Sequence, residues 1–251
     1  MTDFDFGILL LPFIAGLLVL ATHIPLGMKV LARGVIFSDL AVAQIAGLGV
    51  IAAGLAGLSG EPVLVQLTAG ASALCGAAVL SWIEQHLPDV KEAAIGLTFV
   101  LAASAGILLM SRDVHAGEHL KDLLVGQILW VGSSQVVATA LLSAALLILW
   151  HTRQEQLGRL GFYVVFALAV TASVQLVGIY LVFASLIVPA LATWRLGQRR
   201  MRYAWGVGIA GYAAGLLLSA WFDLPAGAAI VWAMAIAGIT TTLLTKPQKE
   251  A

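Results

Sequence analysis

Long apolar stretches separated by short polar connections dominate the pattern along this chain. Most of them approach the roughly 20 residues that an α-helix needs to cross the hydrocarbon core of a bilayer. The pattern therefore predicts an all-α membrane bundle of about nine spans, forming a single domain over residues 1–251. The expected spans are 6–22, 34–58, 63–83, 92–110, 126–150, 160–176, 177–193, 204–221 and 225–244.

One of these stretches, residues 161–193, is too long for a single upright crossing. About 33 residues rising 1.5 Å each cover roughly 50 Å, well beyond the hydrocarbon thickness. We expect two crossings, or one crossing and a broken helix, with the chain turning around 175–178. Pro189 lacks an N–H donor and clashes with the preceding turn, so the helix should break or end after it.

Composition supports the membrane class and excludes others. Hydrophobic residues make up 61% of the chain, charged residues 10%, and the mean hydropathy is +1.01, which excludes a soluble domain. The 13 basic residues balance the 13 acidic ones, so net charge predicts no nucleic-acid partner. A single cysteine excludes an intrachain disulfide.

The distribution of Lys and Arg predicts the orientation. With alternating spans and a cytoplasmic C-terminus, eleven basic residues fall inside and only Arg112 and Lys121 fall outside. Cytoplasmic loops of membrane proteins carry such an excess, so we expect the N-terminus outside. The inner residues are Lys29, Arg33, Lys91, Arg153, Arg159, Arg195, Arg199, Arg200, Arg202, Lys246 and Lys249.

The expected outer loop RDVHAGEHLKD carries His115 and His119, two candidate metal ligands. It also matches the H-x-x-E-H pattern of zinc hydrolases through His115, Glu118 and His119. Gly117 argues against the rigid helix that this pattern needs. Transient metal capture, hydrolysis and ordinary loop polarity remain alternatives for this loop.

No G-x-x-x-x-G-K-[ST] phosphate-binding loop occurs in the chain. The chain thus has no phosphate-binding loop of its own, and if transport here is driven by ATP, we expect ATP hydrolysis on a separate chain. We expect this chain not to be an enzyme and to hold no permanently bound cofactor, and a metal ion would be cargo.

Asp39 stands alone in an apolar run. On one continuous helix it would lie six residues, or roughly 9 Å, beyond Arg33. A carboxylate at such depth is costly and should face a bundle interior or a wet cavity. Three interpretations are open: it lines a metal path, it pairs with a base such as Arg33 or caps a later helix, or it is protonated and hydrogen-bonded.

Several motifs resemble the membrane permeases of ABC importers for zinc, manganese and iron, over about residues 26–240. LARGVIFSDLAVAQIAGLG is similar to the family's basic residue followed by G-D-A-x-x-H-A-x-x-P-G. KEAAIGLTF resembles its E-x-A-I-G-I segment, and DLLVGQILW its L-F-G-x-I-L segment. VQLVGIYLVFASLIVPALA resembles its longest signature, and DLPAGAAIV completes the order.

The resemblance implies a homodimeric permease in the bacterial inner membrane, embedded in lipid, with two cytoplasmic ATP-binding subunits and a periplasmic metal-binding protein. It implies that Asp39 lies in the metal path of a divalent transition metal, zinc first, with manganese or iron behind it. It also places an ATPase-coupling segment at residues 190–203. The candidate coupling residues are Thr193, Trp194, Arg195, Arg199, Arg200 and Arg202.

The chain departs from the family at Ala43, where members carry a histidine one helical turn after the aspartate. Losing an imidazole removes a preferred zinc ligand. Either the site is weak and transient, or the cargo differs. A metal chelate such as a siderophore or cobalamin is therefore the alternative substrate. A zinc-dependent membrane hydrolase that uses the His115-Glu118-His119 loop is a further alternative function.

Overall fold

The computed structural model describes residues 7–58, 60–110, 126–153 and 156–245, and in these ranges the chain is helical with no strand. The long helices are α1 (Gly7–Arg33), α2 (Ser38–Leu55), α3 (Pro62–His86), α4 (Lys91–Met110), α6 (Ser133–Arg153), α7 (Gly158–Val177), α8 (Ile179–Ala192), α9 (Arg200–Phe222) and α10 (Ala226–Leu244). Three short 3₁₀ turns join them: η1 (Pro88–Val90), η2 (Ile128–Trp130) and η3 (Gly197–Arg199).

Within these described ranges, eight helices are long and apolar enough to cross a membrane, and α8 is a shorter apolar helix. The predicted all-α membrane bundle is confirmed, and the protein is a multi-pass membrane protein. Two boundaries differ most from the prediction. The first helix does not end near residue 22 but continues through Lys29 to Arg33, and the fifth predicted span, 126–150, becomes an α-helix only from Ser133. Two prolines inside α1, Pro12 and Pro25, do not end it.

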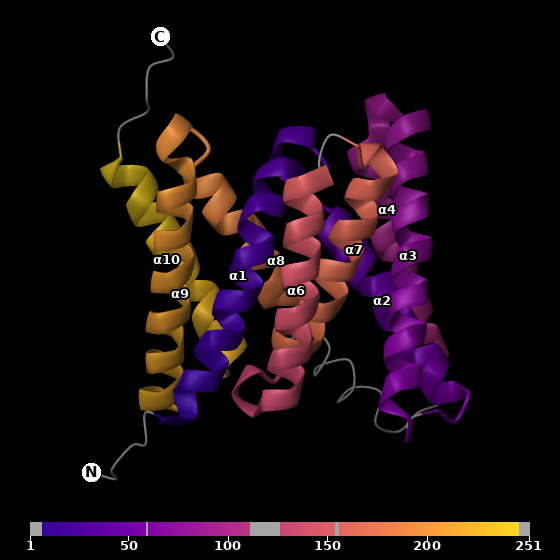
Figure 1. The fold of residues 1–251 in the computed structure, drawn as a ribbon, viewed down its shortest axis with the longest axis horizontal. Coiled ribbons are helices and arrows are strands. Elements are labelled where there is room, and N and C mark those ends of the chain that lie inside the picture. Colours follow the sequence, from indigo (N-terminus) through magenta and orange to yellow (C-terminus); the bar gives the residue numbers. More distant parts are fainter. Residues whose placement is uncertain (1–6, 59, 111–125, 154–155, 246–251) are drawn as a thin grey trace.

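The helices form a bundle with a buried centre and two flanking groups (Figure 1). α1 packs on α8 and α9, while α2 packs on α3, α4 and α7. α9 and α10 lie together at one edge, with α3 and α4 at the other. α7 is the most buried of the membrane-length helices. α7 thus lies inside the bundle, in contact with α1, α2, α3, α6 and α8.

The long apolar stretch is divided where the sequence predicts. Gly178 has φ 81°, a left-handed conformation that favours glycine, and it separates α7 from α8. Its N–H donates to the carbonyl of Val174 (2.8 Å), and its own carbonyl accepts from Val182 (3.1 Å). α8 then continues through Pro189 for one turn and ends at Ala192.

A tight turn separates α1 from α2. Gly34 has φ 64°, and the N–H groups of Gly34 and Val35 donate to the carbonyls of Leu31 and Val30 (3.3 Å each). This pairing is a Schellman motif, which ends a helix at a left-handed glycine. The expected continuous helix from Arg33 to Asp39 is therefore wrong, because the chain reverses before Ser38 and restarts as α2.

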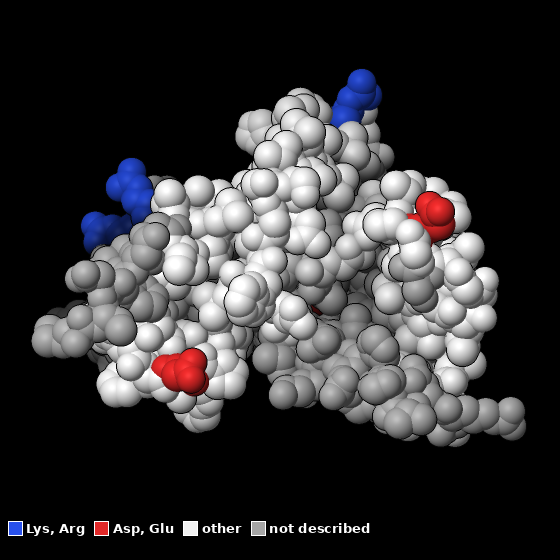
Figure 2. Space-filling view, turned by 90° about the horizontal axis from the view of Figure 1, so that it is seen from below, with Lys and Arg blue, Asp and Glu red and all other residues white. Residues whose placement is uncertain are grey.

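The basic ends of several helices come together at one end of the bundle. Arg33, Lys91 and Arg159 all contribute to a single polar network there, as predicted from their common placement inside. The opposite end, where α1 begins, is mostly uncharged over its described surface, with isolated Lys, Arg, Asp and Glu side chains (Figure 2). Among the described residues, this end therefore carries less charge than the end where Arg33, Lys91 and Arg159 meet.

Candidate functional site

Asp39 lies in the first turn of α2, directly after the α1–α2 turn. Its side chain is buried, with 1% exposure. Neither carboxylate oxygen has a hydrogen-bond partner among the described residues. A buried polar group without a partner costs free energy, typically about 1–3 kcal/mol and more when charged. Asp39 is therefore a costly group whose retention calls for a ligand or a functional role.

The neighbours of α2 indicate which way Asp39 faces. One side of α2 packs on α3, where Ile45 approaches Gly76 and Gly49 approaches Ala69. A second side packs on α4, where Leu48 and Ile51 approach Gly106. With roughly 100° between successive residues, Asp39 falls on neither of these sides.

The other helices that α2 contacts are α7 and α8. Ala43 follows Asp39 by one turn on the same face and is also buried, at 1% exposure. Asp39 and Ala43 therefore face the bundle interior beside the two helices that carry the longest signature, VQLVGIYLVFASLIVPALA.

Two of the interpretations open for Asp39 do not hold in the structure. The Arg33 guanidinium pairs with Glu84 (3.4 Å) and not with Asp39. Although α2 does begin one residue before Asp39, the Asp39 carboxylate makes no capping hydrogen bond among the described residues. The hydrogen bond expected for a protonated, satisfied Asp39 is also absent among the described residues. The role of Asp39 in a metal path stays a prediction.

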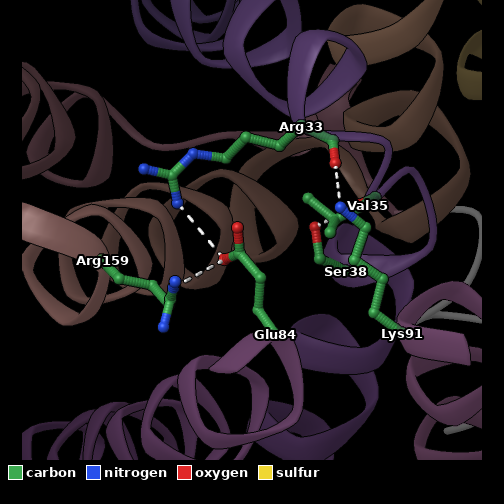
Figure 3. A network of polar contacts seen from close by, with 6 residues as sticks. All are labelled: Arg33, Val35, Ser38, Glu84, Lys91 and Arg159. Carbon is green, nitrogen blue, oxygen red and sulfur yellow. Dashed lines mark hydrogen bonds and ion pairs between the residues drawn. The ribbon is translucent and has the colours of Figure 1, made fainter. Parts of the chain in front are cut away.

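A charged network surrounds the turn that leads into α2 (Figure 3). Glu84 on α3 accepts from Arg33 (3.4 Å) and lies 3.9 Å from Arg159 of α7. The Arg33 guanidinium also stacks over the ring of Phe162, 4.1 Å from its centre. These contacts join the ends of α1, α3 and α7.

Two residues at the start of α4 hold the same turn. Lys91 Nζ donates to the carbonyl oxygen of Arg33 at 2.6 Å. Glu92 Oε1 accepts from the backbone N–H of Phe37 at 3.1 Å. Inside the turn, the Ser38 hydroxyl donates to the Val35 carbonyl at 2.6 Å.

The predicted coupling segment is the connection from α8 to α9. Thr193 is fully buried and donates to the Pro189 carbonyl (2.7 Å), whereas Trp194 is half exposed and stacks under Arg195. Arg200 donates to the Ala190 carbonyl at 3.2 Å, so the first residue of α9 holds the end of α8. Arg199 and Arg202 are exposed. The segment thus presents Trp194 and basic side chains on a rigidly anchored turn.

The candidate ligands His115 and His119, with Glu118, lie outside the described residues. In the part of the chain that the structure describes, no group of three or more His, Cys, Asp or Glu side chains is placed to hold a metal ion. Asp39 is thus the one candidate metal-path residue that the structure describes.

Sequence reasoning missed several polar residues in or next to apolar helices. His23 in α1 is fully buried, and its Nδ1 lies 3.0 Å from the Val19 carbonyl oxygen. Nδ1 also lies 2.9 Å from the Thr22 hydroxyl oxygen, whereas Nε2 has no hydrogen-bond partner among the described residues. Sequence reasoning also did not predict that Glu84, Lys91 and Glu92 meet around the α1–α2 turn. An ionisable residue inside or at the end of a span was the available signal.

Fold and site together define a polytopic helical membrane protein with a buried carboxylate facing its centre. A family profile described as the ABC 3 transport family matches residues 5–158 and 154–245, nearly the whole chain. The chain belongs to the ABC 3 transport family.

Two curated relatives show moderate similarity. The chain is 25% identical over 174 residues to a "Probable iron transport system membrane protein" of Haemophilus influenzae, covering 61% of this chain and 64% of that protein. It is 27% identical over 179 residues to an "Uncharacterized membrane protein in ycf23-apcF intergenic region" of Cyanophora paradoxa, covering 61% and 59%. The matches thus span less than two thirds of these relatives.

A solved structure shares the fold. A chain of "PsaBC from Streptococcus pneumoniae in complex with Fab" aligns over 96% of this chain and 93% of its own length. The TM-score is 0.77 and the sequence identity 22%. This likeness confirms the helical architecture over almost the whole length of both chains.

Proposed function

We propose that this chain is the membrane-spanning permease subunit of an ATP-driven importer for a divalent transition metal. The observation that carries the proposal is Asp39, a buried carboxylate that faces the centre of an ABC 3 family bundle and has no hydrogen-bond partner among the described residues. A carboxylate oxygen can replace part of the hydration shell of a divalent cation. Bound cargo would give this otherwise unpaired group its missing partner.

Zinc is the first cargo that we propose, with manganese and iron as the alternatives. The name of the Haemophilus relative refers to iron transport. Ala43 supplies no imidazole, so each chain offers a site with oxygen ligands and weak affinity. Such a site releases metal readily, which suits a translocation path, and selectivity then rests with a delivering protein outside the membrane.

The proposed assembly is two copies of this chain with two cytoplasmic ATP-binding subunits and a periplasmic metal-binding protein. The absence of a phosphate-binding loop from the sequence requires that ATP is bound elsewhere. The connection from α8 to α9, with exposed Trp194 and anchored by Arg200, is the segment that we propose to contact the ATPase. The N-terminus would lie outside an inner membrane and the C-terminus in the cytoplasm.

The test is zinc uptake by cells that express the chain with its partner subunits. We expect Asp39→Asn, which keeps the shape and removes the charge, to abolish ATP-dependent uptake while the permease still assembles with its ATPase. Asp223→Asn, at the exposed turn between α9 and α10, is the matched control and should leave uptake unchanged. Full uptake by Asp39→Asn would contradict the proposed role of this carboxylate.

A further inference from the structure

Lys91 and Glu92 contact the two ends of the turn that precedes Asp39. The carbonyl of Arg33, the last residue of α1, accepts from Lys91 (2.6 Å). The N–H of Phe37, the residue before α2, donates to Glu92 (3.1 Å). The two side chains are neighbours in sequence at the start of α4. One short segment of α4 therefore holds both helix ends.

The signs of these two charges match the helix ends that they contact. The C-terminal end of a helix carries partial negative charge and unpaired carbonyl groups, and Lys91 meets this end of α1. The N-terminal end carries partial positive charge and unpaired N–H groups, and Glu92 meets this end of α2. Glu92 does from another helix what the glutamate of a capping box does within one, because it accepts from the N-cap N–H. Both bonds are charge-assisted.

No side-chain hydrogen bond fixes the Asp39 carboxylate among the described residues, although the side chain is buried. Hydrogen bonds therefore act on its position only through the backbone of the turn before it. Lys91 and Glu92 hold that backbone through Arg33 and Phe37. Glu84 in turn pairs with the Arg33 side chain, and Figure 3 shows Lys91 and Glu84 at this turn.

We infer that Lys91 and Glu92 are positioning residues for Asp39, acting as a clamp on the α1–α2 turn. The link to metal transport rests on the proposed function of Asp39. The clamp itself does not, because it concerns the turn alone. A movement of α4 would shift the start of α2 and the Asp39 carboxylate with it.

The first experiment measures the turn directly, by hydrogen–deuterium exchange of the purified full chain in detergent. The variant exchanges the two charges, Lys91→Glu with Glu92→Lys, so that composition is unchanged and each helix end meets a charge of its own sign. We expect exchange in residues 37–44 to rise about tenfold, because both charge-assisted bonds are lost. Arg153→Gln is the control, because the Arg153 side chain donates only to Gln156 among the described contacts. It should leave the exchange of residues 37–44 unchanged.

The second experiment measures zinc uptake and tests the link to Asp39. In Lys91→Met we expect the half-saturating zinc concentration to rise about tenfold with little change in the maximal rate, because the carboxylate is displaced but still present. Lys91→Arg keeps a charged donor at this position, so its half-saturating zinc concentration should equal that of the unaltered protein. A purely structural role would instead lower the amount of assembled permease and the maximal rate together.

The outcomes separate the two proposals. Unchanged exchange in the charge-swapped variant overturns the clamp, whatever the cargo. The positioning role is overturned if exchange rises in the charge-swapped variant and Asp39→Asn abolishes uptake, but Lys91→Met takes up zinc like the unaltered protein. Unaltered uptake by Asp39→Asn overturns the proposed function and leaves the exchange result as the test of the clamp.

Discussion

At the scale of single residues, buried polar groups in this chain fall into satisfied and unsatisfied classes. Ser185 and Tyr212 satisfy each other at 3.0 Å between α8 and α9. Glu84 is satisfied by arginines, with 13% of its side chain exposed. Asp39 and the Nε2 of His23 have no such partner among the described residues. Since unpaired buried groups reduce stability, the unsatisfied class is where function is expected.

The two arginines on Glu84 should differ in their contribution to stability. The Arg33 side chain is 22% exposed and also stacks on Phe162, whereas Arg159 is 43% exposed at 3.9 Å. We expect Arg33→Gln to lower the free energy of unfolding by about 2 kcal/mol. Arg159→Gln should lower it by less than about 1 kcal/mol, because solvent screens the pair. Thermal unfolding in detergent micelles measures both, and equal losses would contradict the difference in burial.

At the scale of elements, close backbone approach joins neighbouring helices. A side-chain carbon at Gly27 of α1 would overlap the backbone carbonyl oxygen of Leu186 in α8. Similarly, one at Gly215 of α9 would overlap the backbone of Ile230 in α10. Small residues allow such approach between membrane helices, where packing replaces the hydrophobic effect as the driving force. These glycines therefore set the spacing between α1 and α8 and between α9 and α10.

Gly27→Ala should consequently destabilise the α1–α8 contact. Overpacking against backbone, which cannot rotate away, costs about 1–3 kcal/mol. Gly206→Ala in α9 meets nothing within 4 Å and is the matched control, expected to be neutral or stabilising by up to about 1 kcal/mol. Thermal unfolding of the two variants side by side gives the comparison. A stable Gly27→Ala protein would mean that α1 and α8 separate at little cost.

At the scale of the whole molecule, the described residues place a charged network at the end of the bundle where α1 ends, whereas the described surface at the opposite end carries only isolated charges (Figure 2). The charged end contains the Arg33–Glu84–Arg159 network, the clamp on the α1–α2 turn and the basic α8–α9 connection. The positive-inside tendency predicts that this end is cytoplasmic. Asp39 would then lie near the cytoplasmic end of its path, close to the proposed ATPase contact.

Cysteine labelling tests this orientation. In a Cys75→Ser background, Leu224→Cys at the α9–α10 turn should react with a membrane-impermeant thiol reagent added to intact cells. Leu87→Cys, between α3 and α4, should react only after the membrane is opened. Both positions are exposed in the structure, at 47% and 37%. The reverse labelling pattern would place the clamp and the α8–α9 connection outside.

Much of the architecture was predictable from the chain because bilayer thickness and backbone hydrogen bonding leave few options. Apolar length identified the spans, and the break at Gly178 followed from a stretch too long for one crossing. The first span was predicted to end near residue 22, whereas α1 continues to Arg33, because a helix can extend beyond its apolar part while a long base such as Lys29 keeps its charge in water.

The sequence by itself determined the membrane class, the separation of charge along the chain, and Asp39 and Ala43 as the residues to explain. Those are properties of composition and spacing. Only the tertiary structure decided that Arg33 pairs with Glu84, that Asp39 has no hydrogen-bond partner among the described residues, and that Lys91 and Glu92 hold the turn before it. Residues some 50 positions apart meet there because helix rotation and packing, which no local pattern encodes, set their neighbours.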